Sequence, residues 1–262
     1  MIKFSYFPGG KKNCVTFSYD DGDLKDKWVA KLLYDYGMKG TFNLMNKGTA
    51  LLPTDEFREI YFNHEIACHG EVHASLDSVA YQSIIGEIMK NRLLLEEKTG
   101  YPVVGMAYAN GRFSDPAVDV LKACGIVYSR TVYNTNGFTL PKDFMRWGPT
   151  CHHKNCIEMG EKFLSLFDGY FSGPRLFYIW GHSYEFARDE NYYILEDFCK
   201  MLAHNDEVWY ATNMEIFSYV KACRELIISA DEKIIKNPTL TDIWLERDGE
   251  PVLVKAGQTM FF

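Results

Sequence analysis

Short apolar runs alternate with amphipathic stretches along most of the chain, and this alternation constrains the fold more than any other feature. The runs NCVTFSY (Asn13–Tyr19) and GTFNLM (Gly40–Met45) have the composition of buried strands. Between them, Leu24–Tyr36 has the apolar spacing of an amphipathic helix, and Gly37 follows it as a helix-ending residue. Repeated strand–helix units predict an α/β protein with a parallel sheet, either open or closed into a barrel.

The same alternation continues along the chain. Further strands are predicted in EIACH, VVGMAYA, GIVYSRTV, RLFYIWGH and EVWYATN, and further helices over Glu56–Asn63, about Ser78–Thr99, Met159–Phe171 and Tyr192–Ala203. After about Arg224 the pattern changes to short strand-like runs, which are separated by the turns RDGEP and KAGQT. We therefore predict a main domain over residues 1–223 and a small β appendage over residues 224–262.

Charge and cysteine content narrow the classes of function. The net charge is −7 and the sequence has no basic run, which argues against a nucleic-acid partner. No stretch is long enough to cross a membrane, and the first residues lack the apolar core of a signal peptide. The seven cysteines are scattered, so we expect reduced thiols in a cytoplasmic protein. The oligomeric state stays open, with a homo-oligomer among the options.

Unusual polar residues follow three of the predicted strands. Asp20 and Asp21 follow VTFSY, His69 and His73 follow EIAC, and His182 follows LFYIWG. Reactive side chains gather at the carboxyl ends of strands in parallel α/β folds. Two imidazoles and a carboxylate are a common ligand set for a catalytic divalent metal. Because adjacent side chains of an extended chain diverge, one aspartate can bind the metal while the other serves as a base.

Each of these pieces has an ordinary explanation when taken alone. Paired aspartates before a glycine commonly form a turn or a helix cap. A pair of histidines four residues apart is as often a surface accident, and a single histidine after a strand is usually structural. Their coincidence at three strand ends favours a metal-dependent catalytic site. His64 precedes the EIA strand and so lies at the opposite end from His69, which indicates a structural role.

The motifs also resemble those of a known family. YDDG resembles the TFDDG motif of the polysaccharide deacetylases, the NodB-homology group of carbohydrate esterases, and HEIACHGEVH is similar to their HEIxxHxxxxH segment. The resemblance covers about residues 13–220 and implies a distorted (β/α) barrel, commonly of seven strands. It also implies one divalent ion, Zn²⁺ first and Co²⁺ or another ion as alternatives, held by Asp21, His69 and His73. Asp20 would be the general base, and His182, in the IWGH sequence, would be the general acid.

The chain departs from the family pattern in its third motif. AYANG (Ala107–Gly111) stands where the family has an RxPYG-type sequence, so Ala107 takes the place of the arginine that pairs with the base aspartate. Arg112, Arg130 and Arg146 are the candidates to replace it, and the sequence does not choose among them. A fourth motif of the DxxDW type is also missing, and FMRWGPTCHH occupies the corresponding region.

Several other residues are candidates for substrate contact. Glu185 follows His182 by three residues and either orients it or begins a helix. In CHHKNC an independent zinc site is disfavoured because no second ligand pair lies at structural-zinc spacing, although His152 or His153 fits a loop over the barrel mouth. For the aromatic candidates, core packing is the more ordinary explanation. The full set of expected contacts is Tyr108, Asn110, Arg146, Trp147, His152, Trp180 and Glu185.

The resemblance and the residues together predict a metal-dependent hydrolase that removes N- or O-linked acetyl groups from a carbohydrate. One alternative is hydrolysis of another C–N bond in a small cyclic ureide or imide, which the absence of a signal peptide favours. The other alternative is a catalytically weakened carbohydrate-binding protein, which the altered third motif suggests.

Overall fold

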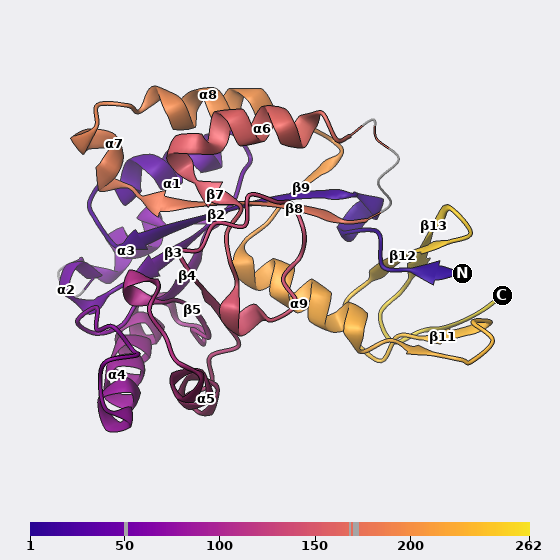
Figure 1. Cartoon of the computed structure of the whole chain (residues 1–262), viewed down its shortest axis with the longest axis horizontal. Helices are drawn as coiled ribbons and strands as arrows, with labels where there is room; N and C mark the ends of the chain where they lie inside the picture. Colours follow the sequence, from indigo (N-terminus) through magenta and orange to yellow (C-terminus); the bar gives the residue numbers. More distant parts are fainter. Residues whose placement is uncertain (50–51, 168, 170–172) are drawn as a thin grey trace.

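The computed structural model describes residues 1–49, 52–167, 169 and 173–262 (Figure 1). Within these residues, seven parallel strands form a curled half-barrel in the order β6-β5-β4-β3-β2-β8-β7. A further strand, β9, pairs with the start of β2. The predicted α/β fold with a distorted seven-stranded (β/α) barrel is therefore confirmed. The strands are β2 (Asn13–Asp21), β3 (Gly40–Leu44), β4 (Glu65–Cys68), β5 (Gly105–Ala107), β6 (Tyr128–Arg130), β7 (Cys151–His152), β8 (Arg175–His182) and β9 (Val208–Tyr210).

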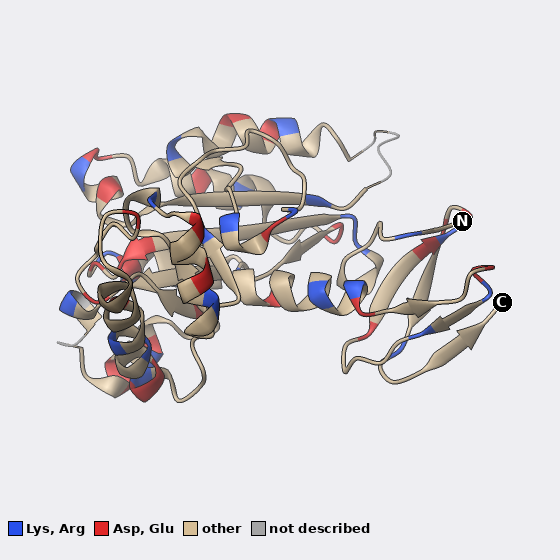
Figure 2. Cartoon of the chain, turned by 60° about the horizontal axis from the view of Figure 1, so that its bottom comes forward, with Lys and Arg blue, Asp and Glu red and all other residues tan. Residues whose placement is uncertain are grey.

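Helices cover the outside of this sheet, with α6 and α8 side by side above it and α4 and α5 below in the view of Figure 1. The predicted helix Met159–Phe171 instead begins at Cys156 and ends at Leu164, and its positions 168, 170 and 171 lie outside the described residues. The helices are α1 (Asp26–Asp35), α2 (Asn46–Thr49), α3 (Thr54–Ile60), α4 (Tyr81–Thr99), α5 (Asp115–Ala123), α6 (Cys156–Leu164), α7 (Tyr184–Arg188), α8 (Tyr193–Leu202) and α9 (Asn213–Arg224). None of these described helices is both long and apolar enough to span a membrane. Figure 2 shows both acidic and basic residues distributed over the helices.

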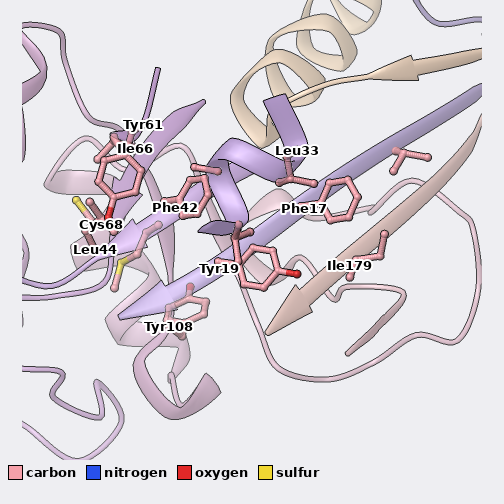
Figure 3. Close-up of a cluster of buried hydrophobic side chains, with 14 of the residues drawn as sticks. Phe17, Tyr19, Leu33, Phe42, Leu44, Tyr61, Ile66, Cys68, Tyr108 and Ile179 are labelled. Carbon is pink, nitrogen blue, oxygen red and sulfur yellow. The ribbon is translucent and has the colours of Figure 1, made fainter. Parts of the chain in front are cut away.

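The main hydrophobic core fixes where the strand ends lie. β2 is buried at every position except its last, so the strand is held rigidly up to Asp20. Figure 3 shows part of this core, with Phe17 and Tyr19 from β2, Phe42 from β3 and Ile179 from β8. Phe17 also packs edge-on against Phe198 of α8, with their ring centroids 5.8 Å apart. Tight packing on both faces of β2 therefore gives the residues at its carboxyl end a fixed platform.

The residues after α9 form two small antiparallel sheets. One has the order β10-β11-β14, and the other has the order β1-β12-β13. The N-terminal strand β1 thus belongs to a sheet of the C-terminal appendage. The boundary predicted between residues 223 and 224 assigns β1 to the main domain and does not include this pairing. The strands are β1 (Ile2–Lys3), β10 (Ile227–Ile228), β11 (Ile234–Lys236), β12 (Ile243–Arg247), β13 (Glu250–Val254) and β14 (Thr259–Phe261).

A second core joins the appendage to the barrel. Ile243 and Leu245 of β12 and Val254 of β13 are buried in it together with Tyr219 of α9. The Tyr219 hydroxyl donates to the carbonyl of Tyr6 at 3.1 Å and accepts from the backbone N–H of Trp244 at 3.0 Å. α9 therefore lies between the two parts and contacts both.

Candidate metal centre and catalytic site

The three polar strand ends identified in the sequence meet at one edge of the sheet. Asp20 and His182 are register partners on the parallel strands β2 and β8. His69 comes directly after β4 and lies with its Nε2 3.4 Å from Asp21 Oδ1 and 3.9 Å from Asp20 Oδ2. His73 Nε2 is 3.7 Å from the same Asp21 oxygen. One oxygen and two imidazole nitrogens therefore converge within 4.8 Å of one another.

The protonation pattern of His69 makes this cluster suitable for a cation. Its Nδ1 donates to the carbonyl of Ala107 at 2.9 Å, which leaves the lone pair of Nε2 directed at the cluster. Asp21 Oδ1 is buried and accepts no hydrogen bond from the described residues. A carboxylate oxygen and an imidazole lone pair that face each other repel unless a positive charge lies between them. The donor set therefore fits a divalent metal, and Asp21, His69 and His73 are the residues that would hold it.

Backbone strain marks the same residues. Asp21 has φ of 80° and His73 has φ of 64°, although both carry a side chain that disfavours this left-handed region. Strained conformations of this kind persist where the surrounding structure imposes them, and they cluster at functional sites. Burial raises the pKa of Asp21, but a proton or positive charge on the neighbouring imidazoles, His69 first, brings it below the ordinary value, so the carboxylate favours positive charge at this position. Asp21 is thus held as a carboxylate in the geometry of a ligand.

Two polar residues of α4 hold the loop that carries the histidines. Asn91 Oδ1 accepts the backbone N–H groups of His69 at 3.0 Å and Gly70 at 3.1 Å. Glu87 Oε1 accepts those of Val72 at 3.0 Å and Ala74 at 2.9 Å. Sequence reasoning missed both residues. Their signal is a pair of polar residues four apart on the buried face of a helix, and only the fold shows what they bind.

Gly70 permits the close approach of this loop to α4. It has φ of 91°, and a Cβ at this position would lie 2.5 Å from Glu87 Oε1. No other residue type satisfies both requirements without displacing Glu87. The glycine between the two histidines is therefore part of how the loop is positioned.

Arg130 is the arginine that pairs with Asp20. Its Nη2 donates to Asp20 Oδ2, while Asn43 Nδ2 donates to Asp20 Oδ1 at 2.9 Å. Arg130 is the register partner of Ala107 across β5 and β6, so the guanidinium enters from the strand next to the third motif. Burial raises the pKa of Asp20, but the charge of Arg130 and the nearby imidazoles lower it overall. The other two candidates are engaged elsewhere, Arg112 with Asp77 and Arg146 with Asp115 and Asp143.

His182 lies between the aspartates and a second carboxylate. Its Nε2 is 3.9 Å from Asp21 Oδ2, and its Nδ1 is 3.6 Å from Glu185 Oε1. Burial lowers the pKa of His182, but the interaction with Glu185 and the charges of Asp20 and Asp21 raise it overall. The imidazole is therefore favoured in its protonated form beside the proposed base, which suits a group that gives a proton.

Comparison with known proteins agrees with this geometry. Residues 8–129, which include the aspartates and the histidine loop, match the polysaccharide deacetylase family. Over this part of its length, the chain is similar to the polysaccharide deacetylases. No curated protein matches the chain.

Three solved structures show the same fold. A probable polysaccharide deacetylase from Pseudomonas aeruginosa PAO1 superposes with a TM-score of 0.66 at 15% identity, covering 81% of this chain and 92% of its own. A candidate polysaccharide deacetylase from Mycobacterium smegmatis gives a TM-score of 0.64 at 18% identity, covering 83% of this chain and 93% of its own. PuuE allantoinase gives a TM-score of 0.64 at 14% identity, covering 81% of this chain and 91% of its own.

The structure separates the remaining expected contacts into buried and accessible residues. Tyr108 and Trp147 are fully buried, Tyr108 stacked on Phe113 and Trp147 packed against Tyr128 and Phe144. They have no surface to offer a substrate, so we withdraw both as substrate contacts and assign them to the core.

The accessible candidates fall into two groups. Arg146 is held by its two aspartates, and Asn110 is exposed and donates to Ser75 Oγ at 3.1 Å. His152, Trp180 and Glu185 are grouped around His182, with the rings of His152 and Trp180 5.1 Å apart at their centroids. Trp180 also lies over the Arg130 guanidinium at 4.7 Å. This second group borders the catalytic residues and is the better placed to contact a substrate.

Proposed function

We propose that the chain is a metal-dependent hydrolase that removes acetyl groups from a carbohydrate. The observation that carries the proposal is the meeting of Asp21, His69 and His73 with the Asp20–Arg130 pair and His182 at one edge of the sheet. A ligand set, a positioned carboxylate base and a protonated imidazole are the parts that hydrolysis of an amide or ester needs. The match of residues 8–129 to the polysaccharide deacetylase family supports acetylated sugars as the substrate class.

In this mechanism Asp21, His69 and His73 hold one divalent ion, Zn²⁺ first and Co²⁺ as an alternative. When bound, such an ion supplies a Lewis acid that polarises the acyl carbonyl and lowers the pKa of water. Asp20, fixed by Arg130 and Asn43, accepts the proton of the attacking water. His182 donates a proton to the departing amine or hydroxyl of the sugar.

The two alternative functions differ in how well they fit the site. A catalytically weakened binding protein was suggested by the lost arginine of the third motif, and the pairing of Arg130 with Asp20 removes that reason. Hydrolysis of a cyclic C–N bond uses the same base and acid, and PuuE allantoinase has the same fold. We therefore retain the second alternative as the one to test beside deacetylation.

The test compares metal content and hydrolysis in the parent protein, Asp20→Asn, Asp21→Asn and the exposed control Asp55→Asn. Metal is measured by mass spectrometry, and hydrolysis by acetate release from N- and O-acetylated sugars and by opening of cyclic ureides and imides. We expect Asp21→Asn to lose the ion, Asp20→Asn to keep it and lose turnover, and Asp55→Asn to match the parent. Ureide or imide opening without acetate release would favour the alternative. Retention of turnover in Asp20→Asn would contradict the mechanism.

A further inference from the structure

A second group of metal-ligating side chains lies behind His182, on the side away from Asp21. His152 Nε2 is 2.8 Å from Glu185 Oε2, and His182 Nδ1 is 3.6 Å from Glu185 Oε1. The ligating atoms of these three residues all lie within 4.8 Å of one another. We propose that His152, Glu185 and His182 form a second divalent-cation site, with the borderline nitrogen and oxygen donors that zinc and cobalt accept.

The backbone makes this group a preformed arrangement. His152 ends β7 and His182 ends β8, and these parallel strands are paired beside each other. Glu185 lies in the first turn of α7, and its Oε2 accepts the backbone N–H of His182 at 3.3 Å. Each donor therefore comes from a fixed strand end or helix start, and a cation has little ordering to impose.

Two of the donors are prepared for a cation, and the third must change its tautomer. His152 Nδ1 accepts the backbone N–H of Lys154 at 3.4 Å, so a cation would have to displace the proton that His152 Nε2 shares with Glu185. Burial raises the pKa of Glu185, but the neighbouring imidazoles of His152 and His182 bring it far below the ordinary value, so the group is a carboxylate. His182 Nδ1 is buried and has no hydrogen-bond partner that meets normal geometry among the described residues. A third imidazole, His153 Nε2, lies 3.5 Å from Glu185 Oε2. Three donor groups thus lie close together, and His153 contacts one of them.

One neighbouring charge opposes a cation here. Arg188 Nη2 is 3.5 Å from Glu185 Oε1. Its side chain is 58% exposed, however, and its Nε and Nη2 donate to Asp189 at 2.6 and 2.8 Å. Because Arg188 is already neutralised by Asp189 and screened by solvent, its repulsion of a bound ion is weak.

An ion at this site would compete with catalysis. To give a proton, His182 must be an imidazolium with a proton on each ring nitrogen. An ion that takes the lone pair of Nδ1 prevents this form, so excess metal would inhibit the enzyme while the first ion activates it. This consequence rests on the acid role proposed for His182, whereas the binding site itself does not.

The experiment titrates metal-free protein with Co²⁺ and Zn²⁺, measuring ions bound by equilibrium dialysis and cobalt coordination by visible absorption. We expect about two ions per chain in the parent and about one in His152→Gln and in Glu185→Gln. Asp21→Asn should keep the weaker ion and lose the tighter one. His204→Asn, which changes an exposed histidine, should match the parent. Circular dichroism of each variant checks that it is folded.

Two results would overturn the proposal. One is a single bound ion in the parent at saturating metal, and the other is a second ion retained by both His152→Gln and Glu185→Gln. Acetate release at rising metal concentration adds the functional test: the parent should lose rate at excess metal, and His152→Gln should lose this inhibition. If no substrate is hydrolysed, the stoichiometry still decides whether the second site exists.

Discussion

The Asp20–Arg130 pair joins residues that are 110 positions apart and fully enclosed by the protein. Removing one partner of a buried ion pair leaves an uncompensated charge, which costs about 3–5 kcal/mol. We predict that Arg130→Met lowers the free energy of unfolding by about this amount and sharply reduces kcat, while the metal stays bound. In chemical denaturation, the double variant Arg130→Met/Asp20→Asn should lose less than the sum of the two single variants. Additive losses would mean that the two residues are not coupled.

His64 provides a pH prediction that does not involve the catalytic site. Its Nδ1 accepts the backbone N–H of Gly40 at 3.1 Å, and its Nε2 donates to the carbonyl of Ala30 at 2.9 Å, so the neutral ring satisfies both partners. Burial is the main reason why the pKa of His64 is lowered from 6.5 to about 4. A depressed folded-state pKa gives stability that is present above pH 6.5 and is lost as the pH falls toward 4.

The expected loss over this range is about 3 kcal/mol of unfolding free energy, from a pKa difference of about 2.5 units. Denaturant unfolding at several pH values measures it. His64→Gln, which cannot titrate, should lack this part of the pH dependence. Parallel curves for the parent and the variant would show that the pKa of His64 is the same in the folded and unfolded states.

At the scale of elements, α4 positions the histidine loop. Asn91→Ala removes the acceptor of two loop N–H groups, and we predict that metal affinity falls by about 10- to 100-fold while the helix remains folded. Gln82→Ala removes an exposed amide from the same helix and should leave affinity unchanged. Metal competition with a chromophoric chelator measures both. Equal metal affinities in the two variants would show that Asn91 of α4 does not position the histidine loop.

The sequence predicted most strands that carry reactive residues, because each is an apolar run followed by an abrupt polar change. It did not predict β7, since two residues give no periodicity to detect. It could not choose Arg130 either. That choice depends on which residue of β6 lies beside Ala107 of β5, and the local spacing of residues does not predict the register between two strands. Glu87 and Asn91 were missed for the same reason: their partners are backbone groups of a distant loop.

At the scale of the whole molecule, the second core packs α9 between the barrel and the appendage. Leu245 of β12 is buried in the second core and is not one of the residues at the proposed catalytic site. We predict that Leu245→Ala lowers the free energy of unfolding by about 3 kcal/mol, from lost burial and the cavity left behind. The metal content of the folded protein at low temperature should not change. A variant that loses its metal while still folded would show that the appendage supports the site directly.

The pairing of β1 with β12 limits the order in which the strands can pair during synthesis of the chain. Ile2 and Lys3 lie against Arg247 and Glu246, so β1 has no partner in this sheet until β12 has left the ribosome. The barrel strands between them pair with closer neighbours and can associate earlier. The barrel strands can therefore associate while β1 is still unpaired, and β1 joins the sheet of the appendage only after β12 has been synthesised.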